Sequence, residues 1–336
     1  MWAKSRRHNK APLLFGRNVR LELVLTSRTI PYRSAYHRFA VFLACATLLL
    51  IVAGALVTSN DAGLSVPDWP TSFGSLYRIP PMVGGVKWEH GHRMFAEFIG
   101  LLIIMMAIWT QRVEQRTWMK ALGWIALAAV VGQGVLGGLT VLFYLPWAVS
   151  TAHATLAQTI FSAVVAMALF TSRSWLQDAE PIYERAFSPS TPTVTAVTAA
   201  CIWIQLILGA AFRHSGIKLL PHLLGACVVA ALVCWTVARV LANYGSVPQL
   251  RKPADFLLAL LMLQLGLGFA AYITRVQWGR DAAQPMASMV LSTVAHVGGG
   301  ALVLATSVIL AIQARRTIQS TAAALVANRS PRKAVA

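Results

Sequence analysis

Charged residues, and acidic residues above all, are scarce in this chain. Only 12% of its 336 residues are charged, with 11 Asp and Glu against 29 Lys and Arg. Hydrophobic residues make up 57%, and the mean hydropathy is +0.62. A soluble domain of this size carries about 25% charged residues. The shortage of charge therefore excludes an ordinary soluble protein and indicates one that lies largely within a lipid bilayer.

Cysteine is scarce too, and its placement excludes several kinds of site. The four cysteines lie inside apolar runs and match no metal-ligand spacing, so we expect them to be packing residues. The first 38 residues lack the early apolar core of a cleavable signal, are rich in Arg and are nearly free of acids. We expect a cytoplasmic tail before a bacterial first span, with an organellar targeting segment as the alternative.

Apolar runs of about 20 residues, the length that crosses a bilayer, fill most of the chain. They predict an all-α, polytopic membrane protein with eight spans, near 39–57, 91–110, 120–141, 150–171, 193–212, 219–241, 254–274 and 289–312. Threading these spans places 22 of the 29 Lys and Arg residues on the side that holds both termini. The positive-inside rule makes that side the cytoplasm. Topology thus accounts for the net charge of +18, and no nucleic acid partner is needed.

The order of motifs repeats in the two halves of the chain. "GALVTS" in the first half and "GAAFRHSG" in the second each precede a span with a histidine near its outer end. Gln133 then opens "QGVLGG" 41 residues after His92, and Gln264 opens "QLGLGF" 42 residues after His222. The repeat predicts two duplicated four-helix bundles in one orientation. The expected parts are basic cytoplasmic tails at 1–38 and 313–336, bundles at 39–171 and 193–312, a first outer loop at 58–88 and an inner linker at 172–192.

Four histidines share one depth in this arrangement. His92, His153, His222 and His296 each lie in the outer part of a span that runs from outside to inside, two in each half. A single such histidine is ordinarily a core or interfacial residue. Paired imidazoles on facing helices of a four-helix bundle, however, can hold a heme iron axially. Zinc needs a third or fourth ligand that neither half offers. The pattern therefore favours one heme site in each half.

Three motifs carry a resemblance to a known family. "VTSNDAGLSVPDWP", "EHGHR" and "QGVLGGLTV", followed by a histidine in the next span, resemble the heme A synthase family over residues 39–312. The resemblance implies oxidation of the ring methyl group of heme O to a formyl group, giving heme A for terminal oxidases. It implies that His92 and His153 bind the substrate heme O, and that His222 and His296 ligate a cofactor, heme b. It also implies functional coupling to heme O synthase and to oxidase assembly factors.

The sequence departs from the family in its first outer loop. Many bacterial members carry a cysteine pair there, and this loop contains no cysteine. A disulfide or a thiol relay in the loop is therefore excluded.

Glu89 is the candidate catalytic residue. It precedes His92 by three positions, about 300° around a helix, so both side chains are expected on nearly the same face. A carboxylate at the porphyrin edge can stabilise positive charge on the methyl carbon, or accept a proton from the water that captures it. The alternative is a helix cap, which stabilises the helix by roughly 0.3–1 kcal/mol.

Other polar residues near the two sites have both functional and structural interpretations. Arg93 and Arg213 are candidate partners of heme propionates. The alternative for Arg93 is an ion pair with Glu97, itself a candidate for a proton path, and the alternative for Arg213 is a solvated loop. His90 is turned by about 200° from the neighbouring ligand and is expected to be interfacial. Trp69 is either an interfacial anchor or part of a lid over the first site.

Two rival functions stay open. A diheme b-type electron carrier would have no need of an acid such as Glu89 beside a ligand. A membrane transporter built from repeats would use its histidines as a proton relay, but would place them near the midplane. We expect multi-pass insertion in the bacterial cytoplasmic membrane, with the mitochondrial inner membrane as the alternative. Whether the chain forms a homo-oligomer is left open.

Overall fold

Eight long helices make up nearly all of the structure, a computed structural model that describes residues 30–177, 181–184, 188–279 and 285–320. They are long and apolar enough to cross a membrane. Their bounds are α2 Ser34–Ser59, α3 Val86–Val113, α4 Thr117–Leu142, α5 Trp147–Phe170, α7 Thr191–Arg213, α8 Leu219–Tyr244, α9 Pro248–Tyr272 and α10 Ala287–Thr317. Each overlaps one predicted span, so the all-α, eight-span fold is confirmed. The greater part of both predicted tails, at 1–29 and 321–336, lies outside the described residues.

The helices extend beyond the predicted spans. α3 begins at Val86 rather than near residue 91, and so includes Glu89 and His90. α9 continues for one more turn as a π-helix, η1 Ile273–Gln277. Hydropathy locates only the apolar centre of a span, whereas a helix continues until other groups or water can bond its terminal amides and carbonyls.

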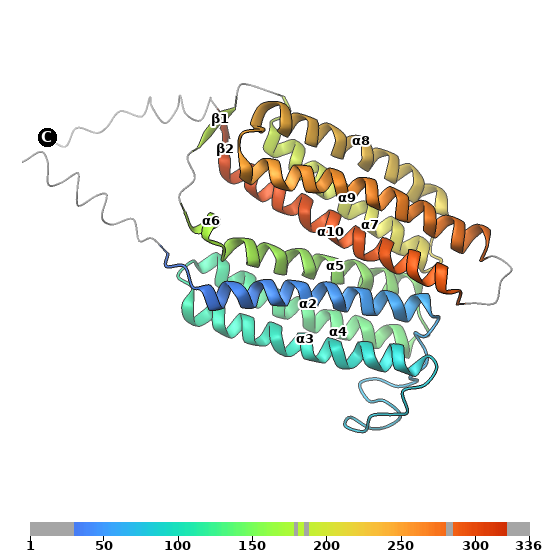
Figure 1. Cartoon of the computed structure of the whole chain (residues 1–336). Coiled ribbons are helices and arrows are strands. Elements are labelled where there is room, and N and C mark those ends of the chain that lie inside the picture. Colours follow the sequence, from blue (N-terminus) through green and yellow to red (C-terminus); the bar gives the residue numbers. More distant parts are fainter. Residues whose placement is uncertain (1–29, 178–180, 185–187, 280–284, 321–336) are drawn as a thin grey trace, which may run out of the picture.

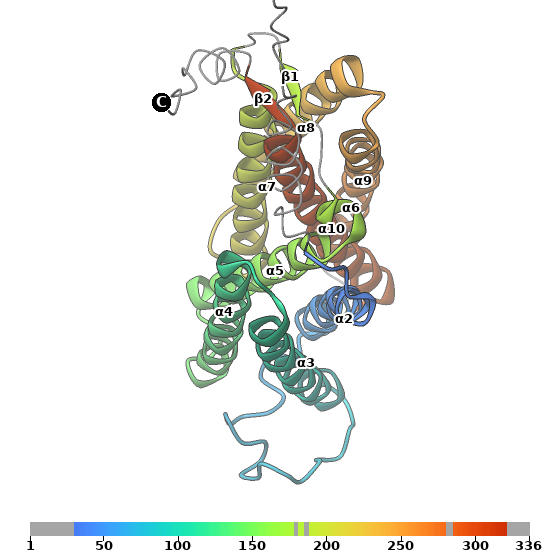
Figure 2. The ribbon, with the colours of Figure 1, turned by 90° about the vertical axis from the view of Figure 1, so that its left-hand side faces the viewer.

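The eight helices form two groups of four with roughly parallel axes (Figure 1). In the N-terminal group, α2, α3, α4 and α5 each contact two neighbours and so close a ring, and α7 to α10 do the same in the C-terminal group. α2, α5, α7 and α10 lie in the middle of the molecule, and the other four helices lie on its two far sides (Figure 2). This arrangement agrees with the two expected bundles, while their origin by duplication stays a prediction.

Small side chains join the two groups. Each group has an apolar core of its own, and a third cluster of Ile51, Phe161, Ala301 and Ala305 lies between them. Lipid tails are as apolar as leucine, so helices in a bilayer associate chiefly through close packing. The alanines of α10 let α2 and α5 approach it closely.

The described chain begins and ends at the same end of the molecule, because an even number of helices crosses it (Figure 1). We call this the inner end and the opposite one the outer end, after the predicted orientation. The linker at the inner end carries two unpredicted elements, α6 Arg173–Leu176 and the strand β1 Ile182–Glu184, which pairs in parallel with β2 Ile318–Ser320. Buried Glu184 accepts a hydrogen bond from Tyr244 of α8 at 2.9 Å, and so fixes the linker to the C-terminal group.

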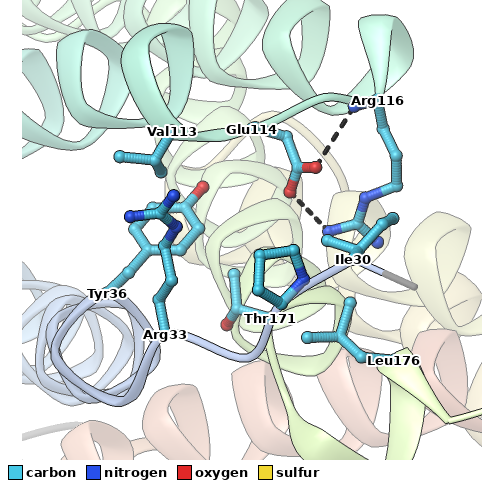
Figure 3. Close-up of a pocket in the computed structure, with 9 residues that line it drawn as sticks. Ile30, Arg33, Tyr36, Val113, Glu114, Arg116, Thr171 and Leu176 are labelled. Atoms are coloured by element: carbon cyan, nitrogen blue, oxygen red, sulfur yellow. Dashed lines mark hydrogen bonds and ion pairs between the residues drawn. The ribbon is translucent and has the colours of Figure 1, made fainter. Parts of the chain in front are cut away.

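A small cavity lies at the inner end of the N-terminal group (Figure 3). Its lining includes Arg33, Glu114 and Arg116, and the last two form an ion pair at 2.6 Å. Although burial raises it, hydrogen bonds and the charge of Arg116 hold the pKa of Glu114 below its usual range. About 30 Å of α3 separates this cavity from His92, so it is not part of the candidate site.

Candidate functional site

The four predicted ligand histidines lie together at the outer end. Each is within the first three turns of its helix and is half-buried. Within each ring of four helices, the two histidines come from diagonally opposite members. The structure therefore brings together the pairs that the sequence suggested, His92 of α3 with His153 of α5, and His222 of α8 with His296 of α10.

His222 and His296 face each other inside the C-terminal group. Their ring centroids are 6.2 Å apart and their planes are 86° apart. A metal–imidazole bond is about 2 Å long, so this separation accommodates one metal ion between two axial imidazoles. No group of three or more His, Cys, Asp or Glu side chains that could hold a metal occurs among the described residues. The pair fits a heme iron better than a zinc ion.

His92 and His153 occupy the corresponding positions in the N-terminal group, in the outer parts of the diagonally opposite helices α3 and α5. The buried Nδ1 atoms of His92 and His296 have no hydrogen-bond partner in the part of the chain that the structure describes. Buried polar atoms are usually paired. A ring nitrogen left without a partner, one in each pair, is consistent with residues that bind a heme.

A glycine on the neighbouring helix faces each of the four rings. The pairs are Gly54 with His92, Gly137 with His153, Gly209 with His222 and Gly268 with His296. A Cβ atom at these glycines would lie only 2.9–3.1 Å from the Cε1 atom of the ring. Because glycine alone has no Cβ, it allows the backbone and the imidazole to approach this closely.

Gly268→Ala is expected to displace the His296 ring and weaken the second site. The new Cβ would lie 2.9 Å from Cε1, and overpacking of this kind costs about 1–3 kcal/mol, roughly a 5- to 150-fold loss of heme affinity. Gly266→Ala is the matched control, because a Cβ there meets nothing within 4 Å. Heme titration of the two purified variants measures the difference. Equal affinities would contradict the assigned role of the glycine.

Glu89 is only 4% exposed and lies at the base of the first outer loop. One carboxylate oxygen accepts a hydrogen bond from Arg93 at 2.6 Å, and the other accepts one from the backbone N–H of Val66 at 2.8 Å. Glu89 also lies in the first turn of α3, where its negative charge favours the helix dipole. The carboxylate ties the loop to α3.

Arg93 holds the same loop through its backbone. Its two terminal nitrogens donate to the carbonyls of Val66, Asp68 and Thr71 as well as to Glu89, at 2.6–3.2 Å. These four bonds match the four hydrogens on the terminal nitrogens, which leaves only Nε for another acceptor. The predicted contact of Arg93 with a heme propionate would have to compete with the loop.

One expectation about α3 is wrong. Arg93 forms its ion pair with Glu89 and not with Glu97, which is exposed on the surface of α3. An acid four residues before a base is the better oriented pair on a helix. His90, expected to be interfacial, is buried beneath the loop with its Nδ1 3.0 Å from the hydroxyl of Ser72.

Trp69 lies against the outer part of α4. A Cβ at Gly138 would lie 2.3 Å from the indole ring, and Gly138 directly follows the glycine that faces His153. The indole therefore covers the helix beside the first histidine pair while part of it stays open to the surroundings. This contact favours a lid over the first site rather than a free interfacial anchor.

Arg213 lies between the two groups. One terminal nitrogen donates to Ser59 of α2 at 2.7 Å, and Ser59 is in turn 2.9 Å from the hydroxyl of Thr293 in α10. The other terminal nitrogen is buried with no hydrogen-bond partner within the described ranges, so it remains free for an anion. Burial and the nearby positive charge of Arg213 lower the pKa of His214 to about 4, so this imidazole is neutral at pH 7.

Sequence analysis missed the side chains that hold three of the histidines. A glutamine on the preceding helix donates its amide N–H to the backbone carbonyl of the histidine, at 2.8–3.0 Å. The pairs are Gln133 with His153, Gln205 with His222 and Gln264 with His296. The signal was present in the sequence as Gln-x-x-x-Gly at 133–137, 205–209 and 264–268.

Comparisons with known proteins agree with this arrangement. Residues 86–220 match the family model COX15-CtaA, described as a cytochrome oxidase assembly protein. A heme A synthase of Shouchella clausii is 28% identical over 234 residues, which cover 68% of this chain and 74% of the relative. A heme A synthase of Symbiobacterium thermophilum is 28% identical over 250 residues, covering 66% and 80%. One of Dinoroseobacter shibae is 32% identical over 131 residues, covering 35% and 32%. Together with the eight spans and their outer histidines, these matches support a relationship to the heme A synthase family and a role in heme A biosynthesis and oxidase assembly.

Proposed function

We propose that the protein oxidises the ring methyl group of heme O to a formyl group and so produces heme A. The N-terminal group binds the substrate, and the C-terminal group holds heme b. The observation that carries the proposal is the placement of four histidines at one end of the helices, two in each group of four. The first of these sites has a loop tied down beside it by a buried carboxylate. The name shared by the relatives supports the product.

The two sites have different tasks. His92 and His153 hold the iron of the substrate, and the glycines facing them leave space for the two rings. His222 and His296 ligate heme b, which supplies electron transfer when it is bound. The free terminal nitrogen of Arg213 offers a charged donor to a propionate.

Glu89 serves the chemical step. Converting a methyl group into a formyl group with the oxygen of water releases protons and electrons from one carbon, so the reaction also needs an external electron acceptor. The buried carboxylate of Glu89 stabilises positive charge that develops on this carbon, and accepts a proton from the water that attacks it. Trp69 and the loop restrict the access of bulk water to the apolar substrate.

The location follows from the charge asymmetry. We infer that the inner end faces the cytoplasm of a bacterial cell and that the histidines face its outside, because 22 of the 29 Lys and Arg residues belong to the inner side. The relatives compared above are bacterial, which supports the cytoplasmic membrane. Coupling to heme O synthase and to oxidase assembly factors is part of the same proposal, and homo-oligomer formation stays an untested expectation.

Extraction of pigment from the purified protein tests the proposal against its rivals. Heme O or heme A beside heme b supports the synthase. Heme b alone would favour a diheme electron carrier, and a protein without heme would favour a transporter.

His92→Ala and His153→Ala are each expected to abolish conversion of heme O, because the substrate loses an axial ligand. We expect at least a 100-fold fall in heme A formation, about 2.7 kcal/mol in the barrier, while heme b in the C-terminal group persists. His37→Ala is the control, since His37 bonds Thr171 at the inner end. The measurement is heme A by chromatography and heme b by its absorption spectrum. Normal turnover in both variants would contradict the assignment.

A further inference from the structure

Three of the four histidine positions share a feature that the fourth lacks. Each glutamine that bonds a histidine carbonyl stands four residues before the glycine that faces the same ring. In the remaining helix pair, the position four residues before Gly54 is Leu50. Leu50 has no hydrogen-bond donor in its side chain and packs against the N-terminal core.

His92 is therefore held less firmly than its partner. The Nδ1 atom of His153 lies 3.2 Å from the backbone carbonyl of Gln133, in addition to the bond that Gln133 donates to the His153 carbonyl. The Nδ1 atom of His92 is buried without a hydrogen-bond partner among the described residues. From α2, the close contact with Gly54 positions the His92 ring by shape alone.

In the second site both histidine carbonyls accept a bond from a glutamine, although the Nδ1 atom of His296, like that of His92, has no hydrogen-bond partner among the described residues. Gln205 donates to the carbonyl of His222 at 2.8 Å, and Gln264 donates to that of His296 at 2.9 Å. The same amide nitrogens lie 3.0 Å and 3.4 Å from a ring nitrogen of each histidine. The bond to the backbone carbonyl fixes the turn that carries the histidine. Outer partners of this kind change metal affinity by about 10- to 100-fold.

We propose that Gln133, Gln205 and Gln264 are positioning residues for three firmly held histidines, and that Leu50 leaves His92 as the yielding ligand of the first site. The proposal rests on the proposed function, in which a substrate occupies the first site and a resident heme the second. A substrate has to enter and a product has to leave, so one loose ligand suits the first site. A cofactor stays bound, so two firm ligands suit the second.

Leu50→Gln tests the first half of the proposal, with Leu50→Met as the matched control of similar size that cannot donate. We expect Leu50→Gln to release heme from the first site about tenfold more slowly and to lower turnover, while Leu50→Met behaves as wild type. The measurement is the rate at which an excess of apomyoglobin removes heme from the purified protein. Electron paramagnetic resonance reports the fraction of low-spin heme at the same site, which we expect to rise only in Leu50→Gln.

Gln264→Met tests the second half, because methionine keeps the length of the side chain and removes its donor. We expect heme b to be lost about tenfold faster than from wild type, with a high-spin fraction that wild type lacks.

The outcomes separate the two proposals. Equal release from Leu50→Gln and Leu50→Met, with both hemes present, overturns the positioning proposal and leaves the proposed function standing. Absence of heme b from the wild-type protein overturns the proposed function instead. Should Leu50→Gln not insert, unchanged retention of heme b in Gln264→Met alone overturns the positioning proposal.

Discussion

Replacing Glu89 by glutamine is expected to leave a protein that inserts and binds both hemes but makes almost no heme A. Glutamine has nearly the size of glutamate, so packing at this buried position is kept. It carries no charge to stabilise a cationic methyl carbon and is a far weaker base. Removing a single electrostatic stabiliser of a transition state costs about 100- to 1000-fold in rate, and we expect a loss of that size.

The contacts of Glu89 require a control for the loop. The carboxylate also accepts bonds from Arg93 and from the backbone of Val66, so Glu89→Gln loosens the loop as well. Arg93→Lys keeps a positive charge beside Glu89 but cannot make the four bonds of the guanidinium. Cleavage by trypsin at the exposed Arg78 reports loop opening in both variants.

A much larger loss of heme A in Glu89→Gln than in Arg93→Lys, at similar rates of cleavage, is the result expected of a catalytic carboxylate. Equal losses of heme A formation in the two variants, at equal rates of trypsin cleavage, would show that Glu89 only anchors the loop.

His222→Ala and His296→Ala are expected to remove the heme b signal from a protein that still inserts. The rings face each other at 6.2 Å, and either substitution leaves an iron with one axial imidazole. Loss of a residue that only hydrogen-bonds a metal ligand costs about 10- to 100-fold in metal affinity, so loss of the ligand itself is expected to cost more. The check is the heme b content of the purified variants, with His37→Ala as the control. A full complement of bis-imidazole heme b in both variants would show that the ligands lie elsewhere.

The parts of this protein that could be predicted are those that depend on local pattern. Runs of apolar residues gave the eight spans, because a bilayer demands about 20 of them at a time. Helical direction then placed His222 and His296 at one depth, and the rings do face each other. The common depth depended on the order of the spans alone, and no long-range contact was needed to find it.

The parts that could not be predicted depend on backbone groups far apart in the chain. Arg93 donates to three backbone carbonyls of the loop. Because every residue has a backbone carbonyl, no residue type in the sequence indicates which ones Arg93 contacts. The burial of His90 follows from the same folded-back loop. Arg213, a candidate propionate partner, bonds Ser59 of the N-terminal group, a contact that only the packing of the two groups creates.

The glutamines differ from these cases, because the Gln-x-x-x-Gly spacing is a local pattern in the sequence. Gln133 and Gln264 mark the internal repeat, and Gln205 lies outside the repeated motifs. Their constant distance of four residues from a glycine was available, but its meaning required knowing that a histidine lies opposite both.

The hydrogen bonds that hold the first outer loop affect the conditions under which the protein can work. Bonds from Glu89 and Arg93 reach the main chain of Val66, Asp68 and Thr71, and the loop contains no cysteine. Thiol reagents and reducing growth media thus leave the loop fastened, where a disulfide would be cut. Since carbonyls and amides accompany every amino acid except for the missing N–H of proline, these particular bonds do not depend on which side chains stand at positions 66, 68 and 71.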